Sequence, residues 1–252
     1  MQHEGFSTAT IAERPDLAEP ADDVCGAAWP TFMLQDDIVE RHFFALYRDY
    51  PEFQFVLLED ATGRIAAVGN CVPVPYNGTA AELPDGGVDW ILTERFERHK
   101  RGQAGSTLFA LQIVVAGEFK GHRLSSECVK TMTSLGSRRD CRVLYAPVRP
   151  NLKARYPRTP MEHYLTWTDG ADMPFDPWIR VHARLGARIV GVCAESMYID
   201  GTVAEWEEWT GMQFPESGRY DVPEALVPVR VQREKDLGEY IEPNVWMEHR
   251  IR

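Results

Sequence analysis

One segment, LQIVVAGEFKGHRLSSECVKTM at residues 111–132, constrains the fold more than any other part of the chain. Its apolar, β-branched run Ile113–Val115 predicts a buried strand that ends in a turn at Gly117. A short basic loop, residues 120–123, follows, and a helix is expected to begin at Ser125. Strand, loop and helix N-terminus together are typical of an anion-binding site, because free backbone N–H groups and the positive end of the helix dipole point to one place.

The basic residues of the loop indicate which anion it binds. Lys120, His122 and Arg123 bring more positive charge than one carboxylate requires, so we expect a pyrophosphate. Contacts to the bound molecule are expected from Ile113, Val115, Lys120, Gly121, His122, Arg123, Leu124, Ser125 and Ser126. The alternative is an ordinary strand–turn–helix whose basic side chains are only solvated.

This loop resembles the coenzyme A motif of the GNAT acyltransferases, which reads roughly Gln/Arg-x-x-Gly-x-Gly/Ala. Lys120 takes the first position of that motif, Arg123 the central glycine and Ser125 the final small residue. Two residues depart from it: Arg123 carries a Cβ where the family brings backbone next to phosphate, and Lys120 is a point charge rather than a planar fork. The resemblance implies an enzyme that uses acetyl-CoA or another acyl-CoA as co-substrate and needs no metal.

A second resemblance lies at residues 176–190, DPWIRVHARLGARIV. Most GNAT enzymes carry a helix ending Tyr-x-x-x-Gly-Phe here, whose Tyr protonates the departing CoA thiolate, and His182 takes the Tyr position. The variant is also similar to GNAT-like domains of polyketide synthases, which act on acyl-CoA and a carrier-protein thiol. Those domains have a Thr near the place of Ala146 and Pro147, so decarboxylation is not expected. The resemblance makes His182 the candidate acid. An unperturbed pKa of about 6.5 allows a histidine to donate a proton near neutrality, though less readily when the ring is buried and neutral, and the alternative is a helix histidine capped by a backbone carbonyl.

The order of the predicted elements and the resemblance indicate an α/β protein with the GNAT acyl-CoA N-acyltransferase fold, a central, mostly antiparallel and splayed mixed sheet (α+β) flanked by helices. Residues 1–252 are expected to form a single GNAT-like domain, with an insertion at about 151–173 and a C-terminal extension from about 201 that lies outside the common core. Strands are expected at Phe6–Glu13, Gln54–Glu59, Arg64–Val74, Thr107–Val115, Arg142–Val148, Arg188–Ala194, Leu226–Gln232 and Tyr240–Glu248. Helices are expected at Asp37–Tyr47, Val88–Arg101, Ser125–Leu135, Trp178–Leu185 and Val203–Trp209.

Acyl transfer also needs a polarised carbonyl and a deprotonated nucleophile. Backbone amides of Ile113–Val115 are candidates for polarising the carbonyl, provided that this strand splays from its neighbour. The candidate catalytic residues for deprotonating the nucleophile are Gln112, which is polar within the apolar strand, and Glu118, which lies at its end. His163 is a further candidate. For each of these three, a solvated or core side chain is the stronger alternative. Cys128 is expected to pack inside its helix rather than act as a nucleophile.

Composition restricts the partners and the compartment. A formal charge of −11 disfavours nucleic acid and anionic membranes, and no apolar run is long enough to span a bilayer. The N-terminus lacks a signal-peptide pattern, and five scattered cysteines without a C-x-x-C pair favour a reducing cytoplasm. The aromatic-rich residues 156–167 and 206–209 either wall an acceptor pocket or pack a lid onto the core.

The sequence therefore predicts a CoA-dependent acyltransferase. The leading hypothesis is acetyl transfer from acetyl-CoA to an amine of a small molecule, by direct attack on the thioester. One alternative is acyl transfer to the thiol of an acyl carrier protein, or related thioester processing in natural-product biosynthesis. Another is a non-catalytic acyl-CoA-binding module. The acceptor, the acyl length, the general base and the oligomeric state stay open, a dimer being one option.

Overall fold

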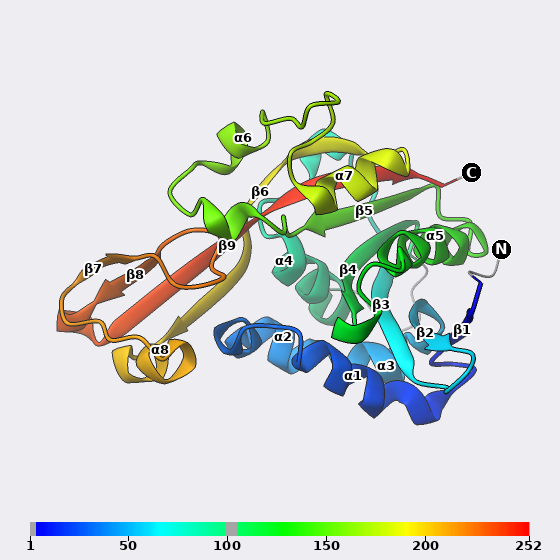
Figure 1. Cartoon of the computed structure of the whole chain (residues 1–252), viewed down its shortest axis with the longest axis horizontal. Coiled ribbons are helices and arrows are strands. Elements are labelled where there is room, and N and C mark those ends of the chain that lie inside the picture. The colour runs from blue at the N-terminus through cyan, green and yellow to red at the C-terminus, as the bar shows by residue number, and fades with distance from the viewer. Residues whose placement is uncertain (1–3, 99–104, 252) are drawn as a thin grey trace.

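A computed structural model describes residues 4–98 and 105–251, and Figure 1 shows how they are arranged. The described strands form one sheet in the order β1-β2-β3-β4-β5-β9-β8-β7, and β6 pairs with β9 beside this path. Paired strands run antiparallel except β4 and β5, which are parallel, so the expected mixed, mostly antiparallel sheet is confirmed. The strands are β1 Phe6–Thr10, β2 Gln54–Glu59, β3 Ile65–Val74, β4 Thr107–Val115, β5 Val143–Val148, β6 Arg188–Gly201, β7 Gly218–Tyr220, β8 Val229–Gln232 and β9 Leu237–Arg250.

Helices flank the sheet on both sides (Figure 1). They are α1 Ala18–Gly26, α2 Asp37–His42, α3 Ala45–Asp49, α4 Gly87–Thr93, α5 Leu124–Ser137, α6 Met161–Tyr164, α7 Pro177–Arg184 and α8 Val203–Thr210. Local capping explains where several begin: Asp36 caps α2 and Asp176 caps α7, each with a side-chain oxygen that accepts backbone N–H groups. Within the residues that the structure describes, no helix is long and apolar enough to cross a membrane.

The side chains of β2 and β3 alternate between two apolar cores on opposite faces of the sheet. Phe55, Leu57 and Ala67 belong to the main core, against which α5 packs. Val56 and Val68 point to the other face and form a smaller core with α1. Helices α5 and α1 therefore cover opposite faces, as Figure 1 also shows.

The parallel pairing of β4 with β5 is short. It joins two residue pairs, the second of them Phe109 with Tyr145, and beyond that level the two strands separate. A bulge in the pairing of β4 with β3 lies just past this point, with Leu111 as the extra residue. Pro147, which has no N–H to donate, is tolerated in β5 because the strand has no β4 partner there. The expected splay is thus present, and it leaves backbone groups of both strands unpaired.

Several predicted elements differ in extent from the observed ones. The segment Asp37–Tyr47 forms two short helices, α2 and α3, instead of one. The helix expected at Val88–Arg101 is α4 followed by a π-helical turn, Glu94–Arg98, and its last residues lie outside the described part of the chain. Strand β6 continues to Gly201 because it pairs with β9 along most of its length. Helix α1 and strand β7 are not among the predicted elements.

The C-terminal strand is part of the central sheet. Strand β9 sits inside the sheet, where it pairs with all six residues of β5 on one side and with β6 and β8 on the other. The elements between β6 and β9, namely α8, β7 and β8, form the projection at the left of Figure 1. Apolar spacing predicts an extended segment at Tyr240–Glu248, but strand order follows from pairing partners that one segment does not reveal.

Candidate active site

A cavity of about 940 Å³ opens where β4 and β5 separate. The separated halves of both strands line it, residues 110–115 of β4 and 146–148 of β5. On one face the lining comes from the loop before α5 and from α7, and on the other from α1, α2 and the residues between them (Figure 1). The cavity thus reaches both faces of the sheet through the gap between the strands, so two molecules can meet there from opposite sides.

The loop before α5 has the backbone geometry of an anion cradle. Gly121 has a φ of +96°, and Arg123, the N-cap residue of α5, has a φ of +59° in the left-handed region. Among the described residues, the amides of Gly121, Arg123, Leu124 and Ser125 have no hydrogen-bond acceptor. Converging free N–H groups at the start of a 14-residue helix fit a pyrophosphate.

Most of the predicted coenzyme-binding residues line the cavity, and two do not. Those that line it are Ile113, Val115, Lys120, Gly121, Arg123, Leu124 and Ser125. The ring of His122 turns back toward Phe6, with 5.9 Å between the ring centroids. Ser126 lies in the first turn of α5, where its amide donates to the carbonyl of Arg123. The anion-binding part of the site is therefore the segment 120–125 with the end of β4.

His182 lies on α7 and lines the same cavity, between the rings of Trp178 and His249. It is 2% exposed, and its Nδ1 lies 2.8 Å from Nε2 of His249. Its other nitrogen, Nε2, is buried and has no hydrogen-bond partner in the described part of the chain. Burial, with a smaller contribution from His249, lowers the pKa of His182 to about 3. The ring is therefore neutral at neutral pH, so it can donate a hydrogen bond but is not an imidazolium acid.

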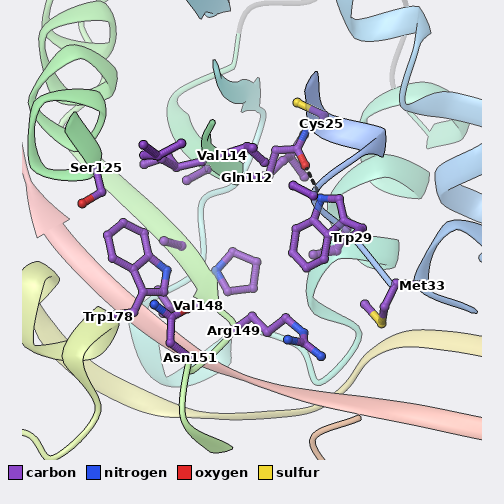
Figure 2. A pocket seen from close by; sticks show the side chains of 18 of the residues that line it. Cys25, Trp29, Met33, Gln112, Val114, Ser125, Val148, Arg149, Asn151 and Trp178 are labelled. Carbon is purple, nitrogen blue, oxygen red and sulfur yellow. Dashed lines mark hydrogen bonds between the residues drawn. The ribbon is translucent and has the colours of Figure 1, made fainter. Parts of the chain in front are cut away.

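Gln112 is the centre of a chain of amide hydrogen bonds. Its Oε1 accepts from Nε1 of Trp29 at 2.9 Å, and its Nε2 donates to Oδ1 of Asn70 at 3.0 Å. Asn70 in turn donates to Gln54 at 3.1 Å. Since a neutral amide is a very poor proton acceptor, this geometry makes Gln112 a support for Trp29, and Figure 2 shows that contact at the edge of the pocket.

Three other candidates lie away from the cavity lining. Glu118 is exposed and forms an ion pair with Arg64. His163 is exposed, and its ring packs edge-on against Trp167 at 5.9 Å. Cys128 is fully buried in α5, where burial raises the pKa of its thiol and so disfavours the reactive thiolate. Among the described residues, no group of three His, Cys, Asp or Glu side chains is placed to hold a metal ion.

On the face opposite the anion cradle, Arg149 follows β5 into the cavity. Its Nε donates to both carboxylate oxygens of Glu242, at 3.0 and 2.9 Å, and its Nη2 donates to the carbonyl of Glu224 at 2.6 Å. The guanidinium also lies 5.8 Å from the ring centre of Trp29. Figure 2 shows Trp29 and Trp178 facing the pocket from opposite sides. The pairing with Glu242 leaves this part of the wall ordered and nearly neutral.

The two ends of the cavity carry opposite charge. Lys120 and Arg123 lie at the end formed by the loop before α5, whereas Asp22, Glu40 and Glu224 line the end formed by α1, α2 and the loop before β8. Burial, and secondarily the neighbouring Asp23, raises the pKa of Asp22. A positive group bound beside Asp22 would relieve this cost of burying a carboxylate.

The two aromatic-rich segments pack against the core and do not wall the cavity. Tyr164 is 1% exposed and donates to Asp176 at 2.8 Å, and Trp167 packs edge-on against Tyr156. Trp206 is fully buried against Phe32. Of the insertion at 151–173, only Asn151 lines the cavity. Since neither Tyr164 nor Trp167 lines the cavity, the packing alternative describes these segments.

Sequence reasoning missed four residues of the site: Trp29, Trp178, Arg149 and His249. Trp178 stands four residues before His182, so helical spacing was a signal that the two share a face. Trp29 and Arg149 reach the cavity only through the fold. His249 lies 67 residues from its partner His182 and meets it because β9 enters the sheet beside β5.

Comparison with known proteins identifies the family. No model of a protein family matches the chain. The arginine N-acetyltransferase avaD of Aspergillus versicolor is 31% identical to it, in an alignment that covers 98% of this chain and 94% of that protein. The loading GNATL domain of CurA from Lyngbya majuscula has the same fold, with a TM-score of 0.62 at 15% identity over 98% of both chains.

A second solved structure, the GNAT-like decarboxylase GphF in complex with isobutyryl-CoA, superposes with a TM-score of 0.55 at 15% identity, over 98% of this chain and 99% of its own. The structural likeness supports the fold, and the full-length relative supports the activity. The cavity between splayed strands, with its anion cradle at a helix N-terminus, agrees with both. The chain belongs to the GNAT superfamily and is a CoA-dependent enzyme that transfers an acyl group to an amine.

Proposed function

We propose that this N-acyltransferase uses acetyl-CoA and acetylates a nitrogen of a small cationic acceptor of the arginine type. The observation that carries the proposal is the opposite charge of the two cavity ends, with Lys120 and Arg123 at one and Asp22, Glu40 and Glu224 at the other. An anionic coenzyme suits the first end and a cationic acceptor the second. The name of the relative from Aspergillus versicolor, an arginine N-acetyltransferase, supports the same class of acceptor.

In the proposed site, residues 120–125 hold the coenzyme pyrophosphate through backbone amides, with Lys120 and Arg123 adding charge. In the proposal, unpaired amides of β4 beyond the splay polarise the thioester carbonyl, and Nε2 of His182 donates a hydrogen bond to the coenzyme sulfur; the end of the β4–β5 pairing and the unpartnered Nε2 support these roles. The acceptor enters from the α1–α2 face, past Trp29. Its nitrogen attacks the carbonyl directly, so no covalent enzyme intermediate is needed.

A substrate panel tests the acceptor. The protein is incubated with acetyl-CoA and, separately, with arginine, a simple alkylamine, an uncharged arylamine and a carrier protein bearing a phosphopantetheine thiol. Mass spectrometry then detects acetylated product, and a thiol assay measures CoA release. We expect arginine or a close relative to give the highest kcat/KM. Acyl loading of the carrier protein in preference to every amine would favour the thiol acceptor and contradict the proposal.

Two neighbouring aspartates provide a matched pair of variants. Asp22 lines the cavity, whereas Asp23 is exposed and does not. Asp22→Asn should raise the KM of a cationic acceptor by about three- to tenfold, since a half-buried charged contact is worth roughly 1 kcal/mol, and should leave CoA affinity unchanged. Asp23→Asn should alter neither quantity. Equal effects of both substitutions would show that Asp22 acts only through the general field of an acidic protein.

The proposed compartment is the cytoplasm, supported by the five cysteines, which are all free and buried.

A further inference from the structure

Two histidines from distant parts of the chain share one hydrogen bond at the wall of the cavity. His182 comes from α7 and His249 from β9, and Nδ1 of the first lies 2.8 Å from Nε2 of the second. Both side chains are buried, with 2% and 3% of their surface exposed. The ring centroids lie 5.1 Å apart, with the rings inclined by 55°. This pairing lies beyond the expected role of His182 and assigns a task to a residue outside the recognised motif.

Both rings are neutral under ordinary conditions. Burial lowers the pKa of His249 to about 4, and burial with the neighbouring His249 lowers that of His182 to about 3. A neutral imidazole carries one hydrogen, so the shared bond has two arrangements. Either His249 donates from Nε2 and His182 carries its hydrogen on Nε2, or His182 donates from Nδ1 and leaves its own Nε2 bare.

The hydrogen-bonding capacity of the bound coenzyme distinguishes these two arrangements. The His182 side chain lines the cavity, and its Nε2 is buried and has no protein partner among the described residues. The sulfur of a thioester, and of the thiolate that leaves, carries no hydrogen and can only accept. A bare Nε2 would therefore meet the sulfur lone pair to lone pair, whereas an Nε2–H group would donate to it.

We propose that His249 is a positioning residue, which donates its Nε2 hydrogen to Nδ1 of His182 and thereby fixes the tautomer of His182 that presents Nε2–H to the coenzyme sulfur. This inference rests on the proposed role of His182. In the reaction, the lone pair of the acceptor nitrogen forms the C–N bond, and the electron pair of the C–S bond leaves with the sulfur. The Nε2–H group stabilises that thiolate by a hydrogen bond, and the proton released by the nitrogen passes to water.

An isosteric pair of substitutions tests the direction of the shared bond. In His249→Gln an amide N–H is available to donate to Nδ1 of His182, whereas in His249→Glu an ionised carboxylate only accepts and selects the opposite tautomer. We expect His249→Glu to lower kcat by about 100-fold, the size typical of losing one donor to a developing anion, while KM for acetyl-CoA changes little. His249→Gln should recover most of that loss. His163→Gln, at an exposed position away from the cavity, serves as the control.

A spectroscopic measurement reads the tautomer of His182 in the wild-type protein itself. In wild-type protein labelled with ¹⁵N-histidine and saturated with acetyl-CoA in the absence of an acceptor, the ¹⁵N signals should show a protonated Nε2 and a bare Nδ1 at His182. The signals are assigned by their loss in His182→Phe. A protonated Nδ1 on His182 in that complex, or equal kcat for the Gln and Glu variants, overturns the inference. If His182→Phe lowers kcat but the His249 variants do not, only the role of His249 fails. If His182→Phe leaves kcat unchanged in folded protein, the proposed role of His182 fails as well.

Discussion

At the scale of single residues, Arg123 is one of two departures from the coenzyme A motif and the one that affects the backbone. It occupies the left-handed region at the N-cap of α5, where a Cβ costs roughly 1–2 kcal/mol and glycine costs much less. The side chain of Arg123 lines the coenzyme end of the cavity. This combination indicates that strain in the backbone is offset by charge supplied to the pyrophosphate.

Arg123→Gly should therefore move stability and binding in opposite directions. We expect the free energy of unfolding to rise by about 0.5–1 kcal/mol, because the relief of strain exceeds the entropy that glycine adds to the unfolded chain. The dissociation constant for CoA should increase roughly tenfold, since one charge-assisted contact is lost. Urea denaturation and titration calorimetry measure the two quantities.

His122→Gly is the matched control for that substitution. His122 is exposed next to Arg123 but has an ordinary backbone conformation and does not line the cavity. The change should lower stability by about 0.5–1 kcal/mol, because glycine gains entropy in the unfolded state without relieving any strain. If Arg123→Gly destabilises the protein to the same degree, the left-handed conformation carries no strain.

At the scale of elements, a pair of buried carboxyls joins α2, α4 and β6. Oδ1 of Asp36 accepts from the first amides of α2, and Oδ2 of Asp89 accepts from the amide of Tyr198. Their remaining oxygens are buried within hydrogen-bonding reach of each other. Burial and the neighbouring charge raise the pKa of Asp89 to about 8, and burial raises that of Asp36. The pair thus holds a shared proton at neutral pH.

This proton makes stability depend on pH. An unfolded Asp releases its proton near pH 4, so the contribution of the pair is complete below that value and is lost as pH rises toward about 8. Asp89→Asn keeps a hydrogen bond to Asp36 without needing the proton. Its unfolding free energy relative to wild type should therefore increase from pH 5 to pH 8.5, by up to about 1.4 kcal/mol per pH unit.

Urea denaturation of both proteins at several pH values measures this difference. Asp37→Asn, at an exposed neighbour of Asp36, should show no such trend. A difference between Asp89→Asn and wild type that stays constant from pH 5 to pH 8.5 would mean that the two carboxyls do not share a proton.

Some elements can be predicted from the local sequence, and others cannot. The strand at Thr107–Val115 is predicted with its observed bounds, because its short length, its β-branched residues and the flanking glycines favour a strand over a helix. The start of α7 also follows from neighbouring residues, since Asp176 caps the helix and Pro177 is its first residue. The partner of His182 and the position of β9 inside the sheet are not local. They depend on contacts between segments far apart in the chain, which no single window of sequence contains.

At the scale of the whole molecule, charge is the property that reaches beyond the site. The formal charge of −11 creates a negative field that attracts a cationic acceptor and repels an anionic coenzyme. At the coenzyme end, local positive charge from Lys120, Arg123 and the free amides of the loop offsets this repulsion. The acceptor end, with Asp22 and Glu40, adds to the overall field.

Salt should therefore act on the acceptor. With acetyl-CoA saturating, raising NaCl from about 20 mM to about 500 mM shortens the Debye length from roughly 20 Å to about 4 Å, and kcat/KM for a cationic acceptor should fall several-fold. The double variant Asp22→Asn, Glu40→Gln should show a shallower dependence, because part of the attraction comes from these two carboxylates. Initial rates at four or five salt concentrations give both slopes. If kcat/KM falls with salt equally steeply in the wild type and in the double variant, the acceptor is attracted by the net charge of the protein alone. If wild-type kcat/KM does not respond to salt, the acceptor does not enter as a cation, and the charge of the α1–α2 end serves solubility.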